Sequence, residues 1–181
     1  MVKKELKIVN IVASSYLNHD IPLIRLAEKL PNTEYNPEQF PGLVMRIKEP
    51  KTSALIFGSG KIVCTGARSM NKLRESIKQI VKNIEKIGIK ITIQPRVKVQ
   101  NMVAAGDIGM DLNLNRLAMD LENTEYEPEQ FPGLVYKLSG TRATFLLFSN
   151  GKIVCTGTRS EPALKEALDK LIDNLVKLKK K

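Results

Sequence analysis

The residues NTEYNPEQFPGLV at positions 32–44 recur as NTEYEPEQFPGLV at positions 123–135, and GKIVCTG at 60–66 recurs unchanged at 151–157. The offset is 91 residues in both cases, and no gap is needed to align the copies. Between residues 30 and 69, 24 of the 40 positions are identical to their partners in the second copy. Two copies are too few for a solenoid. They predict two similar repeats, residues 1–91 and 92–181, intertwined in one structure around a pseudo-twofold axis.

The composition is that of a globular protein, with 43% hydrophobic and 27% charged residues. No apolar run is long enough to span a membrane, and no signal peptide follows the N-terminal lysines, so we expect a cytoplasmic protein. The formal net charge is +10. Residues 1–91 hold 16 Lys and Arg against 8 Asp and Glu, whereas residues 92–181 hold 13 against 11. A basic chain favours an anionic partner, and the uneven division suggests that the two copies face different partners.

Each copy begins with a predicted strand and a short helix. Residues 7–13 and 97–104 are rich in β-branched side chains, which is typical of strands. The helix that follows is expected to have Asp20 or Asp111 as its N-cap, with Pro22 tolerated in the first turn. It should end near Leu30 in the first copy and near Leu121 in the second.

Three short strands and a long helix complete the predicted α+β unit. The strands at 43–48, 53–57 and 61–66 should form an antiparallel meander, in which Ser59-Gly60 or Asn150-Gly151 makes a tight turn. Ser69 and Ser160 should cap the long helices. Spacings of three, four and seven predict a single buried stripe on each long helix, formed by Leu73, Ile77, Ile80, Val81, Ile84 and Ile87, and by Leu164, Leu168, Leu171, Ile172, Leu175 and Leu178.

Strand alternation sorts the side chains of the sheet into two faces. Ile62 and Cys64 should face the helices, and Val63 and Thr65 should face the other way. By the same rule Leu55 and Phe57 share a face, as do Asn10 and Val12. If helices cover one face only, the other face carries valines, leucines and phenylalanines in both copies. Such a face is too apolar to be merely solvated, so we expect it to bind a partner.

Aromatic, amide and basic side chains recur at matched positions on or near this face. Two phenylalanine pairs could be core residues, or exposed rings that wedge between stacked bases. Asparagine and threonine pairs could cap local backbone, or donate hydrogen bonds to the acceptors of the DNA minor groove. Four pairs of basic residues could be solvated, or contact phosphates. These residues are Phe40, Phe57, Phe131 and Phe148; Asn10, Asn101, Thr65 and Thr156; and Arg46 with Lys137, Lys51 with Arg142, Lys61 with Lys152, and Arg68 with Arg159.

The sequence offers little for metal, redox or catalytic chemistry. Cys64 and Cys155 occupy matched positions in one strand and are expected to be buried hydrophobes. Two thiols and one histidine do not make a convincing metal site, and no cofactor is expected. Gly58-Ser59-Gly60-Lys61 resembles a phosphate-binding loop, but its glycine spacing is wrong and Ile62 follows the lysine. His19 corresponds to Met110, so a duplicated active site could not use it. We therefore expect a protein that is not an enzyme.

The doubled Phe-Pro-Gly-Leu-Val element, the doubled Gly-Lys-Ile-Val-Cys-Thr-Gly strand and the central asparagines resemble the TATA-box-binding protein family in its archaeal form. The similarity covers about residues 5–178. It implies a general transcription initiation factor with a pseudo-twofold saddle fold, in which four helices cover the convex side of a ten-stranded antiparallel sheet. The concave side would lie in the minor groove of an A/T-rich promoter box, which the phenylalanines would bend.

The resemblance also assigns roles to individual positions. The phenylalanines match intercalating pairs, and the asparagines and threonines match central hydrogen-bonding groups. Apolar groove contacts are implied for Val12, Val63, Val103, Val154, Leu55 and Leu146.

Partners are implied as well. Glu127, Glu129 and Gln130 match the loop that the archaeal B-type transcription factor grips, through which RNA polymerase would be recruited. The first copy has Asn36 in place of Glu127, which could help to set the direction of transcription. A homodimer of the DNA-free protein through the apolar face remains an open alternative.

Two stretches depart from the family pattern. Ser139-Gly140-Thr141 replaces the acidic-proline turn that the first copy keeps as Glu49-Pro50-Lys51, which puts the phosphate contact of Arg142 in doubt. The chain ends in three lysines, 179–181, where many archaeal relatives have an acidic tail. The alternative function is that of a saddle-fold module with another ligand, since related half-units occur within some DNA-repair and RNA-processing enzymes and fold alone does not fix function.

Overall fold

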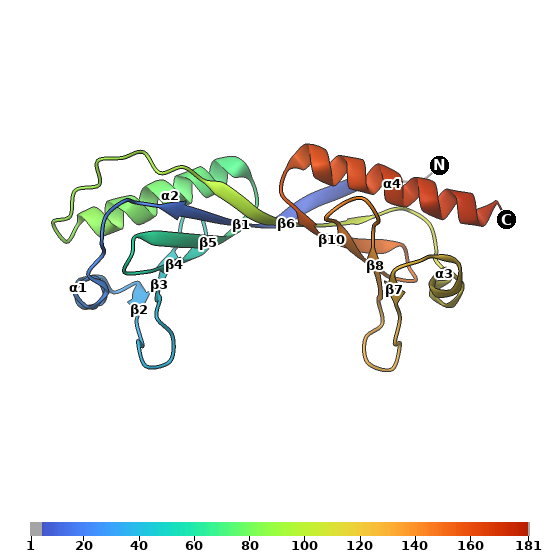
Figure 1. Ribbon diagram of the computed structural model, residues 1–181, viewed down its shortest axis with the longest axis horizontal. Coiled ribbons are helices and arrows are strands. Elements are labelled where there is room, and N and C mark those ends of the chain that lie inside the picture. The colour runs from blue at the N-terminus through green and yellow to red at the C-terminus, as the bar shows by residue number, and fades with distance from the viewer. Residues whose placement is uncertain (1–4, 181) are drawn as a thin grey trace. The chain divides into compact units, whose positions relative to one another are not determined.

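The computed structural model describes residues 5–180. Residues 1–4, and Lys181 of the basic tail, lie outside the described part. The strands are hydrogen-bonded in one ten-stranded sheet in the order β2-β3-β4-β5-β1-β6-β10-β9-β8-β7. The predicted ten-stranded antiparallel sheet with four helices is confirmed (Figure 1). None of the helices in the described residues is long and apolar enough to cross a membrane.

The first copy supplies strands β1 to β5 and helices α1 and α2. Their bounds are β1 Glu5–Tyr16, α1 Leu23–Lys29, β2 Thr33–Glu34, β3 Leu43–Ile47, β4 Thr52–Ile56, β5 Lys61–Ala67 and α2 Met70–Glu85. The second copy repeats this order. Its elements are β6 Lys98–Asp107, α3 Leu114–Asp120, β7 Thr124–Glu125, β8 Leu134–Lys137, β9 Thr144–Leu147, β10 Lys152–Thr158 and α4 Glu161–Lys179.

The chain packs as two compact units whose limits differ from those of the sequence copies. Asn10–Gln100 forms one unit, here called the first-copy unit. The other, the second-copy unit, joins residues 5–9 to residues 101–180. Leu6 and Ile8 at the start of β1 accordingly pack against the core of the second-copy unit. The stretch between α2 and β6 belongs to the first-copy unit.

Within each unit one long helix packs on one face of the strands. Helix α2 contacts β3 and β5, and α4 contacts β10. In Figure 1 the loop between β2 and β3 extends to the side away from α2, and the loop between β7 and β8 does the same relative to α4. The side of the strands turned away from the long helix is called the open face of each unit below.

Both long helices begin as the sequence predicts. The Ser69 hydroxyl accepts a hydrogen bond from the backbone N–H of Lys72 at 3.1 Å, and Ser160 accepts one from Ala163 at 3.2 Å. Each cap satisfies one of the N–H groups that the first helical turn leaves unpaired. The predicted stripes are buried except at Val81 and Leu178, which are half-buried. Val81 is partly exposed because it lines a groove beside α2.

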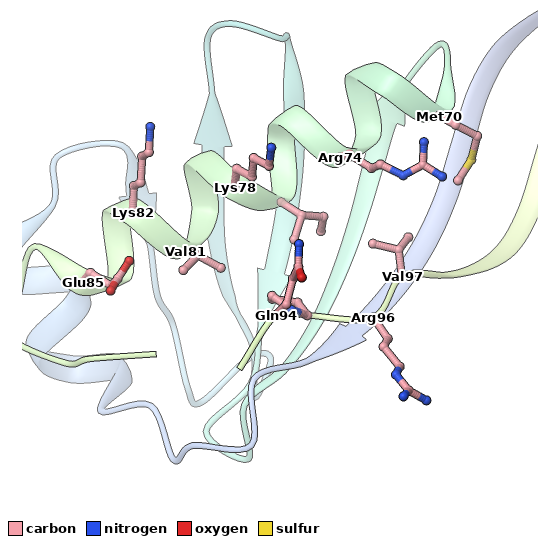
Figure 2. Close-up of a pocket in the computed structure, with 11 residues that line it drawn as sticks. Met70, Arg74, Lys78, Val81, Lys82, Glu85, Gln94, Arg96 and Val97 are labelled. Carbon is pink, nitrogen blue, oxygen red and sulfur yellow. The ribbon is translucent and has the colours of Figure 1, made fainter. Parts of the chain in front are cut away.

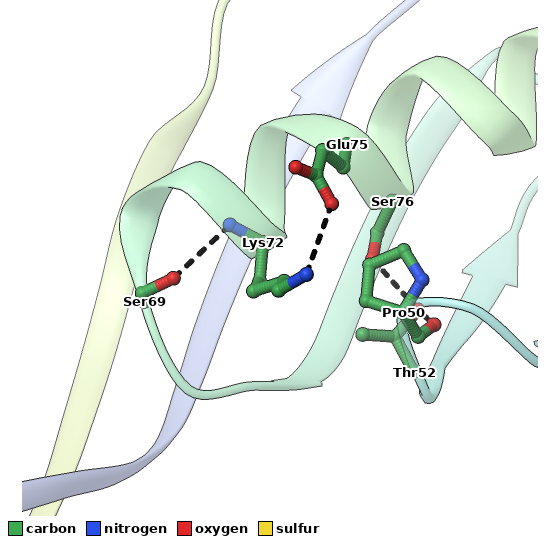
Figure 3. A network of polar contacts seen from close by, with 6 residues as sticks. All are labelled: Pro50, Thr52, Ser69, Lys72, Glu75 and Ser76. Atoms are coloured by element: carbon green, nitrogen blue, oxygen red, sulfur yellow. Dashed lines mark hydrogen bonds and ion pairs between the residues drawn. The ribbon is translucent and has the colours of Figure 1, made fainter.

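A buried pair of hydroxyl groups joins α2 to Thr52, the first residue of β4 (Figure 3). The hydroxyl of Thr52 donates to the hydroxyl of Ser76 at 2.9 Å, and both side chains are buried. At the matched positions of the second copy, Ala143 and Ala167 are also buried. The two copies therefore fill the same place once with a hydrogen-bonded pair and once with methyl groups.

The predicted N-caps of the short helices are wrong. Helix α1 begins after Pro22 without a side-chain cap, and α3 is capped by Asn113, whose side chain accepts from the N–H of Arg116. The reason lies in a pairing between distant segments. Ile21 donates its N–H to the carbonyl of Gly58, and Leu112 donates to Ser149, so the residues around Asp20 and Asp111 stay extended against the hairpin turns. The tight turns themselves are confirmed, with φ of +92° at Gly60 and +87° at Gly151.

Candidate nucleic-acid interface

The alternation predicted for the strands is confirmed on β5 and β10. Ile62 and Cys64 are fully buried beneath the helix, whereas Val63 and Thr65 are half-buried on the open face. The same division holds for Ile153, Cys155, Val154 and Thr156 of the second copy. The open face is therefore partly solvent-exposed in both units, although its side chains are mostly apolar.

Register places the apolar side chains of this face in rows. In the first-copy unit Val44, Leu55 and Val63 lie side by side across β3, β4 and β5. In the second-copy unit Val135, Leu146 and Val154 form the matching row. Val12 and Val103 are also half-buried, on β1 and β6. Val44 and Val135 were missed as candidate residues, although strand alternation from Leu55 through its cross-strand partner would have found them.

The phenylalanines form two edge-to-face pairs rather than core contacts. The ring centroids of Phe40 and Phe57 are 5.9 Å apart with an interplanar angle of 66°, and those of Phe131 and Phe148 are 5.9 Å apart at 72°. This geometry is a favourable one for aromatic pairs. Phe40 is 42% exposed and Phe131 is 41% exposed, so each pair offers one ring edge to solvent.

A glycine beneath each pair allows the rings to approach. A Cβ atom at Gly133 would lie 2.7 Å from Cε1 of Phe131 and 3.0 Å from Cε1 of Phe148. At Gly42 the corresponding distances to Phe40 and Phe57 are 2.7 and 3.1 Å. Any side chain here would push the rings away. The repeated Phe-Pro-Gly motif contained this signal, but the glycines were not singled out from the sequence.

Each central asparagine is held by two residues of its own unit, a threonine and a glycine. The Asn10 amide oxygen accepts from the N–H of Gly66 at 2.6 Å, and its Nδ2 donates to the Thr65 hydroxyl at 3.1 Å. In the second copy Asn101 accepts from Gly157 at 2.7 Å and donates to Thr156 at 2.9 Å. The amide oxygens thus bind backbone, but the backbone of a glycine 56 residues along the chain and not the local backbone that was the alternative.

These contacts fix which end of the amide is available. The amide nitrogen carries two hydrogens, of which the threonine hydroxyl takes one. Within residues 5–180 the second hydrogen has no acceptor, whereas the amide oxygen is engaged by backbone. Each asparagine therefore presents a donor on the open face.

The glycines that hold the amides have positive φ, +104° at Gly66 and +98° at Gly157. They interrupt the regular pairing of β5 with β1 and of β10 with β6, since the register shifts there. A β-bulge of this kind turns the backbone N–H toward the asparagine. Sequence reasoning quoted both glycines in the repeated motif but gave them no role.

The basic residues lie around the open face. In the first copy Thr65 pairs with Ser53, which pairs with Arg46 on β3, so the three side chains form a row. In the second copy Thr156, Thr144 and Lys137 on β8 form the matching row. Arg46 forms a salt bridge of 3.3 Å with Glu34, in which both side chains are more than half exposed. Such a pair contributes little to stability and exchanges readily for another anion.

The other basic pairs occupy strand starts and loops. Lys61 and Lys152 begin β5 and β10 on the side of the open face. Four more are exposed in the loops next to Gly66 and Gly157, namely Lys51 and Arg142 before β4 and β9, and Arg68 and Arg159 after β5 and β10. All eight side chains of the four basic pairs are exposed or half-buried.

The acidic residues predicted to bind a protein lie on the loop between β7 and β8. Glu127, Glu129 and Gln130 are exposed. The carbonyl of Glu127 accepts from the N–H groups of Gln130 and Phe131, both at 3.0 Å. In the first copy Asn36 accepts from Gln39 and Phe40 at the same distance. The two loops thus share one turn and differ in charge.

The cysteines are buried and inert. Burial raises the pKa of the Cys64 thiol to about 11 and that of Cys155 to about 12. At neutral pH neither thiol ionises, so neither is a ready nucleophile or metal ligand. Among the described residues no group of three or more His, Cys, Asp or Glu side chains could hold a metal ion.

Comparison with known proteins gives consistent matches over both copies. The model of the family described as "Transcription factor TFIID (or TATA-binding protein, TBP)" matches residues 5–87 and again 96–178. The TATA-box-binding protein of Archaeoglobus fulgidus is 49% identical over 173 residues, which cover 94% of each chain. That of Thermococcus kodakarensis is 48% identical and covers 98% of this chain and 93% of its own. A solved structure titled "Methanococcus jannaschii TBP" matches with a TM-score of 0.90 and 48% identity, covering 96% of this chain and 99% of that one.

Proposed function

Because the chain belongs to the TATA-binding protein family of transcription factors, we propose that it binds the TATA-box element of promoters through the minor groove of duplex DNA. The observation that carries this proposal is the fixed orientation of the two asparagine amides. Each amide oxygen is engaged by a glycine N–H, so only a donor is offered outward. The minor groove of A·T pairs presents only acceptors, adenine N3 and thymine O2, in either orientation of the pair.

The same arrangement disfavours G·C pairs. Guanine adds an N2 amino donor to the minor groove. Opposite the asparagines it would meet another donor, and opposite the rows of Val44 and Val135 it would meet apolar side chains. The amino group would then be buried without a partner, which costs free energy. The open faces thus distinguish A/T-rich from G/C-rich DNA without reading individual bases.

The phenylalanine pairs are proposed to bend the duplex. Minor-groove proteins insert apolar wedges between base steps and kink the DNA there. Phe40 and Phe131 have exposed rings, and each is supported from behind by Phe57 or Phe148. The eight basic residues around the faces would contact phosphates and position the protein without specifying sequence. We include Arg142 among these phosphate contacts, because it is exposed next to Gly157 just as Lys51 is exposed next to Gly66.

The test is a bending assay by fluorescence transfer between dyes at the two ends of a short duplex. An A/T-rich promoter box should show increased transfer on protein addition, and a G/C-rich control should not. Replacing Phe131 and Phe148 by alanine should reduce the bend on the A/T-rich box. Met119→Ala, which removes an 84% exposed side chain from α3, is the matched control and should leave bending unchanged. Equal bending of both duplexes would refute the proposal.

A protein partner is proposed for the loop between β7 and β8. Glu127, Glu129 and Gln130 would bind the archaeal B-type transcription factor, which would in turn recruit RNA polymerase. The support is that the matched loop of the first copy has the same turn but carries Asn36 in place of Glu127. One copy can then bind the factor in preference to the other, which would set the direction of transcription.

Charge reversal in the two loops separates this role from DNA binding. Glu127→Lys with Glu129→Lys should abolish the ternary complex with the B-type factor in a gel-shift assay, while binding to the A/T-rich box persists. The control is Asn36→Lys with Glu38→Lys, which alters the matched loop and should keep the ternary complex. Loss of the complex in both variants would contradict the assignment to the second copy.

The apolar open faces also favour self-association when DNA is absent. Sedimentation of the free protein should then show a homodimer that dissociates when the A/T-rich duplex is added.

A further inference from the structure

A glutamine and a serine form a polar pair on the mostly apolar open face of the first-copy unit. Gln100, the last residue of that unit, donates from its Nε2 to the hydroxyl of Ser14 at 2.9 Å. Ser14 pairs with Val63 across β1 and β5, and cross-strand partners lie on the same face. Because Val63 lies on the open face, the amide of Gln100 lies there too. Gln100 is half-buried and remains accessible to a ligand.

The backbone that carries Gln100 is held from both sides of the strand. The Ser15 hydroxyl donates to the carbonyl of Arg96 at 2.8 Å, which ties the segment before β6 to β1. Val97, at the end of that segment, points toward α2 across a groove of about 770 Å³ (Figure 2). Strand alternation from Val97 turns Val99 toward the helix side and Gln100 toward the open face. The glutamine is therefore positioned by the fold.

The second copy fills the matched positions with apolar side chains. Val9 corresponds to Gln100, and Ala105 corresponds to Ser14. Both belong to the second-copy unit, where Val9 is 38% exposed and Ala105 pairs with Val154 of the open face. The fold is thus satisfied at this place by a valine and an alanine, so packing alone does not require the polar pair. The central asparagines, the threonines and the apolar rows, by contrast, are identical in the two copies.

The amide of Gln100 offers a hydrogen-bonding group that the central asparagines do not. A glutamine amide carries two hydrogens on its nitrogen and an oxygen that accepts. Ser14 takes one hydrogen, and the side chain has no other hydrogen bond to the part of the chain from 5 to 180. The oxygen of Asn101, in contrast, is occupied by the N–H of Gly157. Gln100 therefore presents an acceptor as well as a donor.

Provided that the chain binds the minor groove as proposed above, we infer that Gln100 accepts a hydrogen bond from the 2-amino group of guanine. The first-copy unit then tolerates a G·C pair at a place where the second-copy unit excludes one. The 2-amino group is the one donor that base pairs present in the minor groove. Against Val9 and Ala105 it would be buried without an acceptor, which costs free energy. An A·T pair still suits Gln100, whose second N–H can donate to adenine N3 or thymine O2.

This difference between the units gives the complex a direction that DNA alone can set. A box whose A·T pairs read the same from both ends offers two equivalent orientations to a pseudo-symmetric protein. A single G·C pair on one side of its centre removes the equivalence, because only one orientation places that pair against Gln100. The other orientation leaves the amino group unpaired, and specificity follows from that penalty. We expect a preference of about tenfold, the usual cost of one mismatched base pair.

The experiment measures orientation by fluorescence transfer. A donor dye is attached at Met119→Cys, since Met119 is 84% exposed, while Cys64 and Cys155 are buried and do not react. The acceptor dye is placed at one end or the other of a duplex with a self-complementary A/T box. One G·C pair is then moved outward from the centre, position by position. The all-A/T box should give equal transfer to both ends, and at least one G·C position should give unequal transfer.

Two exchanges between the copies test the residues. Gln100→Val with Ser14→Ala gives the first copy the side chains of the second. It should remove the preference, and the loss of affinity for the box with the G·C pair should exceed that for the all-A/T box by about tenfold. Val9→Gln with Ala105→Ser makes the reverse change. It should also remove the preference, but it should bind the box with the G·C pair at least as tightly as the unaltered protein does.

Inosine tests the amino group itself, because it is guanosine without the 2-amino group. An I·C pair in place of the G·C pair should restore equal transfer to both ends. Equal transfer for the unaltered protein at every G·C position would overturn the inference, as would a preference that persists with inosine or in Gln100→Val with Ser14→Ala. If the all-A/T box is bound and bent in those cases, the proposed function still stands. Failure to bind the all-A/T box would refute both.

Discussion

The amide oxygen of Asn101 accepts the backbone N–H of Gly157 at 2.7 Å, and the positive φ of Gly157, +98°, belongs to the bulge that turns this N–H toward the amide. The relationship recurs between Asn10 and Gly66 in the first copy. A backbone conformation that favours glycine thus decides which hydrogen-bonding group each open face presents.

Replacing Asn10 and Asn101 by aspartate tests the role of the amide donor. The carboxylate can still accept from the glycine N–H, but it offers no donor outward and adds negative charge. We expect binding to an A/T-rich duplex, measured by fluorescence anisotropy, to fall by about tenfold or more. The unfolding free energy at neutral pH should change by no more than about 1 kcal/mol, since the glycine contact is retained. Unaltered DNA binding would remove the amides from the interface.

The bulge glycine can be tested against a second glycine of similar φ. In Gly157→Ala the new Cβ would collide with the carbonyl of Arg142, whereas at Gly140, φ +75°, a Cβ would meet nothing within 4 Å. Gly140→Ala should cost about 1 kcal/mol for its backbone conformation alone. We expect Gly157→Ala to cost at least about 2 kcal/mol in urea unfolding, because a steric clash adds to that strain. Equal costs would show that φ alone matters at this position.

The glycine beneath each aromatic pair should affect bending more than stability. Gly133→Ala places a methyl group against Phe131 and Phe148, whose rings can move apart at little cost because one of them is exposed. Energy transfer on the A/T-rich duplex should fall toward the value expected when Phe131 and Phe148 are both replaced by alanine. The midpoint of thermal unfolding should shift by only a few degrees, corresponding to about 1 kcal/mol. If Gly133→Ala bends the duplex as the unaltered protein does, the bend does not depend on the position of these rings, which would contradict the prediction.

The buried Thr52–Ser76 pair can be tested by a double-mutant cycle, for which the matched alanines of the second copy show the double replacement already packed. Ser76→Ala leaves the Thr52 hydroxyl without its 2.9 Å partner, and we expect it to cost about 1–2 kcal/mol. Thr52→Ala combined with Ser76→Ala should cost less than the sum of the single changes, because both polar groups are removed together. Ala143 and Ala167 already pack this way in the second copy. Additive costs in urea unfolding would contradict the coupling.

The buried thiols predict a loss of stability at alkaline pH. Burial raises the pKa of Cys64 to about 11, offset in part by a hydrogen bond to Thr52, and burial raises that of Cys155 to about 12. Below the ordinary value of 9.0 both states keep their protons, so stability does not depend on these groups. Above it the unfolded chain releases protons that the folded chain retains, and stability falls by up to about 1.4 kcal/mol per pH unit for each thiol.

This loss should extend from pH 9 to about 11 for Cys64 and to about 12 for Cys155. Urea unfolding at several alkaline pH values measures it. Cys64→Ala with Cys155→Ala should flatten the dependence while lowering stability at all pH values through the lost packing. An unchanged slope in the variant would assign the alkaline loss to other groups.

Much of the fold was predictable because local rules and the global arrangement agree. Ser69 and Ser160 cap their helices, Gly60 and Gly151 make tight turns, and alternation placed Val63 and Cys64 on opposite faces. Membership in a family of transcription factors also confirms that the chain is not an enzyme.

The errors and omissions arise from contacts between distant residues. Asp20 looks like an N-cap in sequence, but Ile21 pairs with Gly58, which delays the helix. The roles of Gly66 and Gly133 depend on Asn10 and on the ring of Phe148, respectively, and neither separation follows from a local pattern. The two-residue strand β2 was missed, since Thr33–Glu34 is too short to show a period.

The packing of Leu6 and Ile8 against the core of the second-copy unit bears on the origin of the molecule. The segment between α2 and β6 belongs in the same way to the first-copy unit, 91 residues further along the chain. In a protein made of one copy alone, the strand segment that precedes the copy could not pack against its own core. A second molecule would have to supply the segment that packs there. Such an ancestor would have been an obligate homodimer with exchanged N-terminal arms. In the duplicated chain each unit instead contains a strand segment that the other copy supplies, so neither copy forms its unit from its own residues alone.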